Sequence, residues 1–237
     1  MKKLLSLLVI CCICLLTAFQ TALAYDDKIE FRDIPWGTDY DTAVERMGID
    51  FHNMSGEYFY AMAVDDVIYG HGASEYTFEN NDINIWAANA IFSLMNSDIT
   101  VGGFQPTSIN MYFAYTPVDG VLTRETKHSE LYAASYKLSE SSKTDVFTNI
   151  YGKLVSLYGE PDDIYTYQDD GYDYYRWNGT DDTALVLKSD DKSSVEIYYV
   201  WYGGDQLLVE ADEVLSQNIA DEAQAEADFI ENDMSGL

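Results

Sequence analysis

The stretch YTYQDDGYDYYRWNGTDDT, residues 165–183, gathers the side chains of this sequence whose types and spacing could bind a ligand. Its aromatic rings offer flat faces with polar tips, which suit a glycan or a partner protein. Its aspartates lie beside glycine turns, where carboxylate oxygens could bind calcium. The stretch therefore predicts either an aromatic contact surface or a calcium site.

The calcium candidates are Asp169, Asp170 and Asp173, in the segment QDDGYD. An EF-hand loop needs acids at alternating positions and a distal glutamate, and neither this segment nor NGTDDT (178–183) supplies them. Aspartate also favours turns, because its carboxylate hydrogen-bonds nearby backbone groups. We therefore interpret these aspartates as turn residues. Weak calcium binding, at about 10⁻⁴ to 10⁻³ M, is the alternative, and we expect no other cofactor.

The aromatic candidates for partner binding are Tyr172, Tyr174, Tyr175 and Trp177. In a strand, Tyr175 and Trp177 would lie on one face and Tyr172 and Tyr174 on the other, because side chains alternate. An antiparallel sheet can pack one face on a helix and expose the other. One of the two aromatic faces is thus predicted to be core and the other a binding surface. The sequence leaves open which is which.

Catalytic motifs are missing from this sequence. The three histidines, His52, His71 and His128, are far apart and match no metal-ligand spacing. There is no nucleophile elbow, phosphate-binding loop or dinucleotide fingerprint. The paired aspartates lie in turns, whereas acid/base catalysis needs two carboxylates in one cleft. We therefore nominate no catalytic residue and expect a protein without enzymatic function.

Residues 1–24 have the pattern of a bacterial signal peptide. Two lysines precede an apolar run at 4–16, and small residues follow up to a cleavage position near Ala24. This pattern predicts a protein that is secreted or held in the cell envelope. The three cysteines all lie in this segment, and a lipoprotein is the alternative interpretation, although no small residue precedes Cys11, Cys12 or Cys14.

The net charge is −28, and removing residues 1–24 would leave 11 basic and 41 acidic residues. Such a charge repels phosphate backbones and anionic membranes. Nucleic acid is therefore an unlikely class of partner, and no later segment is apolar enough to span a membrane. An extracellular protein or a basic peptide fits the charge better. The oligomeric state stays open.

The first half of the chain is predicted to contain a helix and several strands. The segment 31–49 predicts a helix that begins with a capping box of Thr38 and Asp41 and ends at Gly48. Alternating apolar residues predict strands at 57–64, 65–70, 107–115 and 132–138. The segment 82–96 fits a helix and a strand equally well.

The second half is more regular. Ser142 and Asp145 are predicted to cap a helix that ends at Gly159 and Pro161. Four strands are predicted to follow, at about 163–168, 172–177, 183–188 and 194–201, separated by hairpin-forming turns. Residues 205–230 then predict a helix with a thin apolar seam. Ten acids and no Lys or Arg lie between Asp205 and Leu237. We expect this helix to dock partly on its own domain, the alternatives being pairing with another copy or a frayed tail.

The segments IPWGTDYDTAVERMG and YGKLVSLYGEP, followed by YYRWNG and VEIYYVW, resemble motifs of uncharacterised secreted bacterial proteins. Their architecture is similar to the tandem modules of beta-lactamase-inhibitory proteins and of small outer-membrane assembly lipoproteins. The resemblance implies an α+β fold of two helix-plus-antiparallel-sheet modules.

We predict a signal peptide (1–24), a first module (25–140), a second module of order α-β-β-β-β (141–204) and an acidic C-terminal helix and tail (205–237). The predicted function is non-enzymatic binding through an exposed aromatic and acidic sheet face. The alternative is an extracellular enzyme or carbohydrate-binding accessory with a cleft between the modules.

Overall fold

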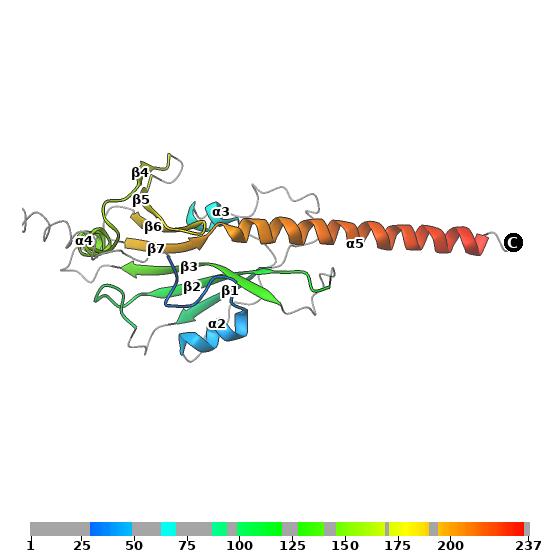
Figure 1. Cartoon of the computed structure of the whole chain (residues 1–237), viewed down its shortest axis with the longest axis horizontal. Coiled ribbons are helices and arrows are strands. Elements are labelled where there is room, and N and C mark those ends of the chain that lie inside the picture. The colour runs from blue at the N-terminus through cyan, green and yellow to red at the C-terminus, as the bar shows by residue number, and fades with distance from the viewer. Residues whose placement is uncertain are drawn as a thin grey trace, which may run out of the picture.

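The protein has the expected α+β fold, and its strands form one antiparallel sheet (Figure 1). The computed structural model describes residues 29–48, 63–69, 87–93, 99–119, 128–139, 146–168, 171–189 and 194–234. Seven strands pair in the order β1-β2-β3-β7-β6-β5-β4. The elements of the first half are α2 (Tyr40–Met47), α3 (Val64–Tyr69), β1 (Ala87–Ser93), β2 (Ser108–Tyr115) and β3 (Ser129–Ser139). Those of the second half are α4 (Val146–Tyr158), β4 (Asp163–Thr166), β5 (Asp173–Asn178), β6 (Thr183–Ser189), β7 (Ser194–Trp201) and α5 (Gly203–Met234).

Helix α2 lies where it was predicted, but its cap differs. Asp39, rather than Thr38, is the N-cap residue, and its Oδ1 accepts the Thr42 backbone N–H at 3.0 Å. The Thr38 hydroxyl instead donates to the carbonyl oxygen of Pro35 at 2.7 Å. The predicted capping box is therefore wrong by one residue. Gly48 ends the helix in the left-handed conformation, with φ 61°, as predicted.

The predicted strand at 65–70 is wrong, because residues 65–69 belong to helix α3. The first backbone N–H of this helix, that of Val64, donates to Asp205 Oδ1 at 2.8 Å. A cap from so distant a residue cannot be read from local sequence. Residues 57–62 of the predicted strand at 57–64 lie outside the described residues, and Val64 at its end begins α3. The ambiguous segment 82–96 contains strand β1.

Strands β2 and β3 confirm two further predictions and add a bulge. Ile109, Met111 and Phe113 share one buried face of β2, as their alternation predicted. Along β3, Ala133 pairs with Tyr112 and Leu131 with Phe113, so Tyr132 is the extra residue. The bulge turns the Tyr132 side chain to the opposite face from Ala134. The predicted strand at 132–138 is thus confirmed, with its alternation interrupted at Tyr132.

The helix and four strands predicted for the second half are confirmed as α4 and β4 to β7. Gly159 follows α4 with φ 82°, the left-handed conformation expected after a helix. Asp181 and Asp182 both have positive φ, 57° and 58°, in the turn between β5 and β6. This pair of angles matches the twist of a tight hairpin, which explains aspartate there. Ser142 and Asp145, the predicted cap of α4, lie outside the described residues.

Each face of the sheet packs against helices. On the first face, α2 and α4 cover a core that includes Phe113, Leu185 and Ile197. On the second face, α3 and the beginning of α5 cover a core that includes Tyr132, Val186 and Val200. Strand β6 is buried along its whole length as a result. In this three-layer arrangement, β3, β7 and β6 bury side chains on both faces of the sheet.

The two halves of the chain meet where β3 pairs with β7. Strands β1 to β3 and β4 to β7 form contiguous blocks on either side of this pairing. The predicted boundary between modules, at residues 140 and 141, falls between these blocks and stays a prediction. Helix α5 leaves the sheet after β7 and extends away from the body, with the C-terminus at its far end (Figure 1).

Candidate interaction surface

Trp177 and Tyr175, two of the predicted binding residues, lie beneath α4 on the first face. Trp177 is 2 % exposed, and its Nε1–H donates to the carbonyl oxygen of Gly159 at 2.9 Å. That carbonyl belongs to the helix terminus, where backbone acceptors lack partners within the helix. The ring of Tyr175 is half-buried, with its centroid 5.3 Å from that of Tyr151 on α4. Both residues thus fix α4 to the sheet.

Tyr174 and Tyr172, the other two predicted binding residues, lie on the second face. Tyr174 is fully buried and stacks on Tyr165, with ring centroids 5.3 Å apart. The Lys188 ammonium lies over both predicted residues, 4.5 Å from the Tyr172 ring centroid and 5.3 Å from that of Tyr174. Such cation–π contacts stabilise the charge of a buried lysine. Tyr172 is itself half-buried.

Burial corrects the expectation of an exposed aromatic sheet face. Tyr174 and Trp177 present no accessible ring, because α3 and α4 with their neighbours cover the two faces of β5. The assignment of the half-buried Tyr172 and Tyr175 to partner binding stays a prediction. The sequence missed this arrangement because the cover of the second face comes from α3 and α5, which are distant from β5 along the chain.

The structure describes only one of the three calcium candidates, Asp173. Asp173 is exposed, and its Oδ1 accepts the Thr166 hydroxyl at 2.7 Å across the β4–β5 pair. Asp169 and Asp170 lie outside the described residues. Within the described ranges, no group of three or more His, Cys, Asp or Glu side chains is placed to hold a metal ion. His128 is exposed beside Glu130, with 3.6 Å between Nε2 and Oε1, and the other two histidines lie outside those ranges.

A partly buried polar network lies on the second face. Tyr198 donates its hydroxyl proton to Glu196, and the Lys137 ammonium is 2.9 Å from Glu196 Oε1. Burial works to raise the pKa of Glu196, but the hydrogen bonds and charges of Tyr198, Lys137 and Lys188 hold it below its ordinary value. Burial also raises the pKa of Tyr112 to about 12.

These groups are not poised for proton transfer near neutral pH. Burial and the adjacent Glu196 charge raise the pKa of Tyr198 well above its ordinary value. The phenol therefore stays protonated while the carboxylate stays ionised. General acid–base catalysis works best when the pKa lies near the operating pH. The network is better suited to fixing the neighbouring strands β3, β6 and β7 than to chemistry.

The inner segment of α5, residues 203–219, is held on the second face. Leu208 and Ala211 are buried there, and Gly204 lies against Tyr132 so closely that an added Cβ would be 2.4 Å from the Tyr132 Cβ. Asp205 caps α3 through Val64. Burial, opposed by the bond from Val64 and assisted by the charges of Asp65 and Asp66, raises the pKa of Asp205. Helix α5 is therefore anchored by close packing at its beginning.

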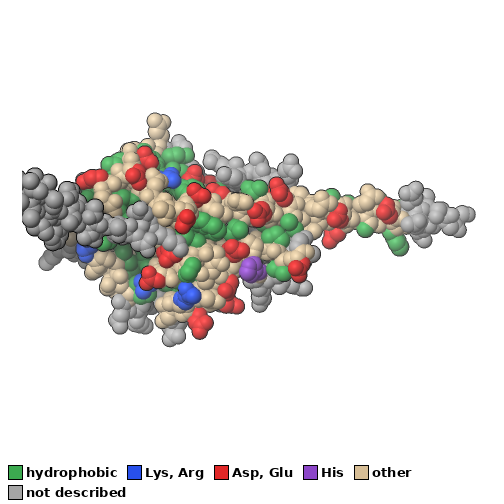
Figure 2. All heavy atoms as spheres, in the orientation of Figure 1, with side chains coloured by type: hydrophobic (Ala, Val, Ile, Leu, Met, Phe, Trp, Pro, Cys, Tyr) green, Lys and Arg blue, Asp and Glu red, His purple; other side chains and the backbone are tan. Residues whose placement is uncertain are grey.

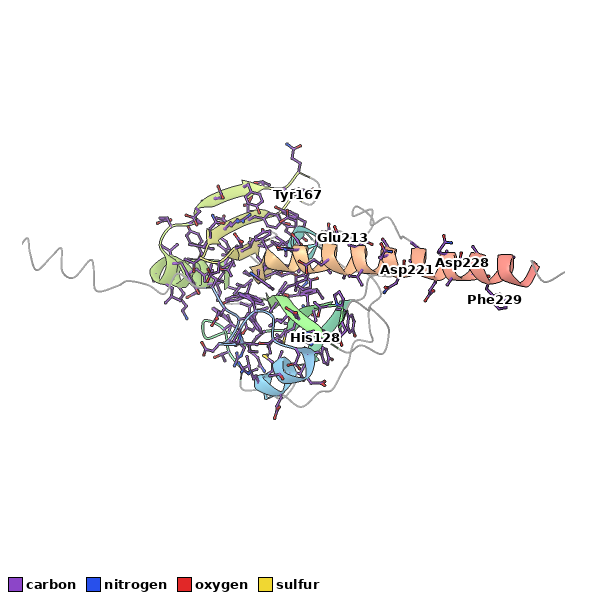
Figure 3. The ribbon with its side chains drawn as sticks, turned by 45° about the vertical axis from the view of Figure 1, so that its right-hand side comes forward. His128, Tyr167, Glu213, Asp221, Asp228 and Phe229 are labelled. Atoms are coloured by element: carbon purple, nitrogen blue, oxygen red, sulfur yellow. The ribbon has the colours of Figure 1, made fainter. Side chains whose placement is uncertain are left out.

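The outer segment of α5, residues 220–230, has no such packing. Every side chain in it is exposed, including Phe229 at 72 % and Ile230 at 51 %. Asp221, Asp228 and Phe229 point from the helix into open space, away from the body (Figure 3). Within the described part of the chain, no helix is long and apolar enough to span a membrane. The outer segment is thus an apolar and acidic surface that the described body does not cover.

The charged side chains of the outer segment are all acidic. Gln217 donates to Asp221 Oδ1 at 2.7 Å, and Gln224 donates to Asp228 Oδ1 at 2.7 Å. These neutral amides satisfy the carboxylate oxygens without neutralising their charge. On the face shown in Figure 2, acidic and apolar side chains occupy the projecting helix, and the visible Lys and Arg side chains lie on the body. In the sequence, the sign that this segment does not dock on the body was the interruption of the apolar seam by Glu222 and Glu226.

No protein-family model, curated protein or solved structure matches this chain.

Proposed function

We propose that this protein is an exported, non-enzymatic interaction protein whose body holds the outer segment of α5 as a binding arm. The observation that carries the proposal is the exposure of every side chain at 220–230, on a helix whose inner segment is packed on the sheet. In proteins, helices gain most of their stability from packing an apolar face. An exposed continuation that carries Phe229 and Ile230 is typical of a surface that packs on a partner.

The anchored inner segment makes the arm suitable for binding. Starting a helix is costly, whereas extending one adds a hydrogen bond for each residue that is fixed. Because residues 203–219 are already helical on the sheet, the outer segment begins from a formed helix. At 1.5 Å for each residue, it reaches about 16 Å beyond the inner segment. Less conformational entropy is then lost when a partner binds than for a disordered tail.

Export and the two-module layout are part of the same proposal. The signal-peptide pattern of residues 1–24 supports export. Each block of strands has its own helix on the first face, α2 beside β1 to β3 and α4 beside β4 to β7. That repetition supports two helix-plus-sheet modules, at 25–140 and 141–204, joined edge to edge. In this interpretation the modules form a scaffold and α5 carries the binding function.

The test is a capture experiment with two chains that begin at Tyr25. One chain runs to Leu237 and the other ends at Ala220, which removes most of the outer segment. Each is immobilised and exposed to secreted and surface proteins of the source organism. We expect a protein that the longer chain retains and the shorter chain releases, with equal melting temperatures for the two baits. Identical sets of captured proteins would reject the arm as the binding element.

A further inference from the structure

The outer segment of α5 presents an apolar stripe that is interrupted by acids. Ala223 and Ile230 lie two helical turns apart in one row, and Glu226 lies between them in the same row. The row continues from Ile219 of the inner segment, which packs against the core of the second face. Phe229 adds a large exposed ring beside that row. Burying such side chains favours association by about 25 cal/mol for each Å² removed from water. Any occupant must therefore offer apolar side chains and also accommodate the carboxylates among them.

The negative charge of the outer segment favours a partner with basic side chains. Glu222 and Glu226 are four residues apart, a spacing at which like charges destabilise a helix by about 0.2–0.5 kcal/mol. Helix α5 has no basic residue in its last turn, where a cation would be favourable to the helix dipole. The hydrogen-bonded partners of Asp221 and Asp228 are neutral amides. Lysine or arginine side chains of a partner would reduce the repulsion between Glu222 and Glu226. They would also place positive charge near the C-terminal end of the helix dipole.

A second copy of the chain does not meet that requirement. Ten acids and no Lys or Arg lie between Asp205 and Leu237. In a pair of α5 helices, Glu222 and Glu226 would thus face other acids or uncharged residues in any register. Removing carboxylates from water without an opposite charge is costly. An anionic membrane surface is excluded by the same repulsion.

Resting on the proposed function, we propose that the outer segment of α5 binds a cationic amphipathic helix. Such a helix places apolar residues every three or four positions, so one of its faces can lie along the row that holds Ala223 and Ile230. Its flanking lysines or arginines lie at the edges of that stripe, within reach of Glu222 and Glu226. The two helices form a short two-stranded pair, in which charge selects the partner and the apolar stripe supplies most of the affinity.

The test uses the full chain from Tyr25 to Leu237 and three synthetic peptides of equal length. The first peptide places leucines at helical spacing among lysines, the second scrambles the same composition, and the third replaces lysine with glutamate. Binding is measured by calorimetry, and helix content by circular dichroism. We expect binding only for the first peptide, with a gain in helix content and weaker affinity at higher salt.

Variants of the chain separate charge from apolar contact. The double variant Glu222→Gln/Glu226→Gln should weaken binding about 5-fold, as for two exposed ion pairs. Phe229→Ala should weaken it about 10-fold by removing apolar contact. The matched control is Asp41→Asn/Glu45→Gln on α2, which removes the same charge from an exposed helix of the body and should leave the affinity unchanged.

The possible results decide between occupants. Equal binding of the first and scrambled peptides would overturn recognition of a helix, because charge alone would then suffice. Dimerisation in sedimentation that Phe229→Ala abolishes, without peptide binding, would assign the stripe to a second copy and overturn the proposal. If no peptide binds while capture still depends on residues 221–237, the inference fails and the proposed function stands. Capture that does not depend on those residues removes both.

Discussion

The inner and outer segments of α5 belong to one continuous helix and have opposite surroundings. In the inner segment, Leu208 and Ala211 are buried and Gly204 allows close approach to Tyr132. In the outer segment every side chain is exposed. Both segments are acidic, so acidity does not distinguish them. Small and apolar residues continue into the outer segment, so the docking of α5 ends where the helix extends beyond the body (Figure 1).

The largest expected effect on this contrast comes from Leu208→Ala. Leu208 is 1 % exposed, and a buried leucine truncated to alanine typically costs about 2–5 kcal/mol of unfolding free energy. The matched change in the outer segment is Ile230→Ala, which should alter stability by less than about 0.5 kcal/mol because that residue is 51 % exposed. Urea unfolding measures both. Equal losses would show that the two segments are packed alike.

The next effect tests the close approach at Gly204. Gly204→Ala places a methyl group against the buried Tyr132, and overpacking of this kind costs about 1–3 kcal/mol. The control is Gly152→Ala in α4, where nothing lies within 4 Å of the added Cβ. That change should instead stabilise by up to about 1 kcal/mol through helix propensity. Chemical denaturation should thus give opposite signs, and a stabilising Gly204→Ala would contradict the tight contact.

A smaller, pH-dependent effect is expected at Asp205. Burial, with the charges of Asp65 and Asp66, raises its pKa above the ordinary value of 3.8. The folded state then binds more protons than the unfolded state above pH 3.8, so ionisation of Asp205 lowers stability as pH rises through that window. Asp205→Asn keeps an acceptor for the Val64 N–H and cannot ionise.

The measurement is the melting temperature of Asp205→Asn and of the unaltered chain from about pH 3 to 7. We expect the difference, variant minus unaltered chain, to increase with pH and then to level off. Asp163→Asn, which removes an exposed carboxylate from the edge strand β4, is the control for the loss of one charge. A difference that falls as pH rises would mean that the ionised Asp205 stabilises the anchor.

The second half of the sheet was predictable because its signals are local. Helical spacing before Gly159 and paired turn residues such as Asp181 and Asp182 are contained in short stretches of sequence. Helix α3 was missed because its cap, Asp205, is 141 positions away from Val64. The long stretch of chain between α3 and β5 likewise explains the error on Tyr174, whose ring contacts Tyr69 of α3. Alternation placed Tyr174 and Trp177 on opposite faces correctly, but it could not show that helices cover both faces.

The residue at which α5 stops docking on the sheet could not be predicted from the local sequence either. The apolar seam of the helix that was predicted at 205–230 does not indicate where contact with the sheet ends. That position depends on where Tyr132 and the neighbouring residues of β3 provide a surface, and thus on tertiary structure. The interruption of the seam by Glu222 and Glu226 was the one visible sign.

The smallest expected effect comes from removing most of the outer segment altogether. A chain that ends at Ala220 should keep its unfolding free energy within about 0.5 kcal/mol, because the deleted side chains described by the structure are exposed. It should lose helix content in circular dichroism in proportion to the residues removed. A chain that ends at Leu207 is the opposite case, since it also loses the buried Leu208 and Ala211 and should be strongly destabilised. If ending the chain at Ala220 were as damaging as ending it at Leu207, the outer segment would be part of the folded body, and its acids and apolar residues would need no partner.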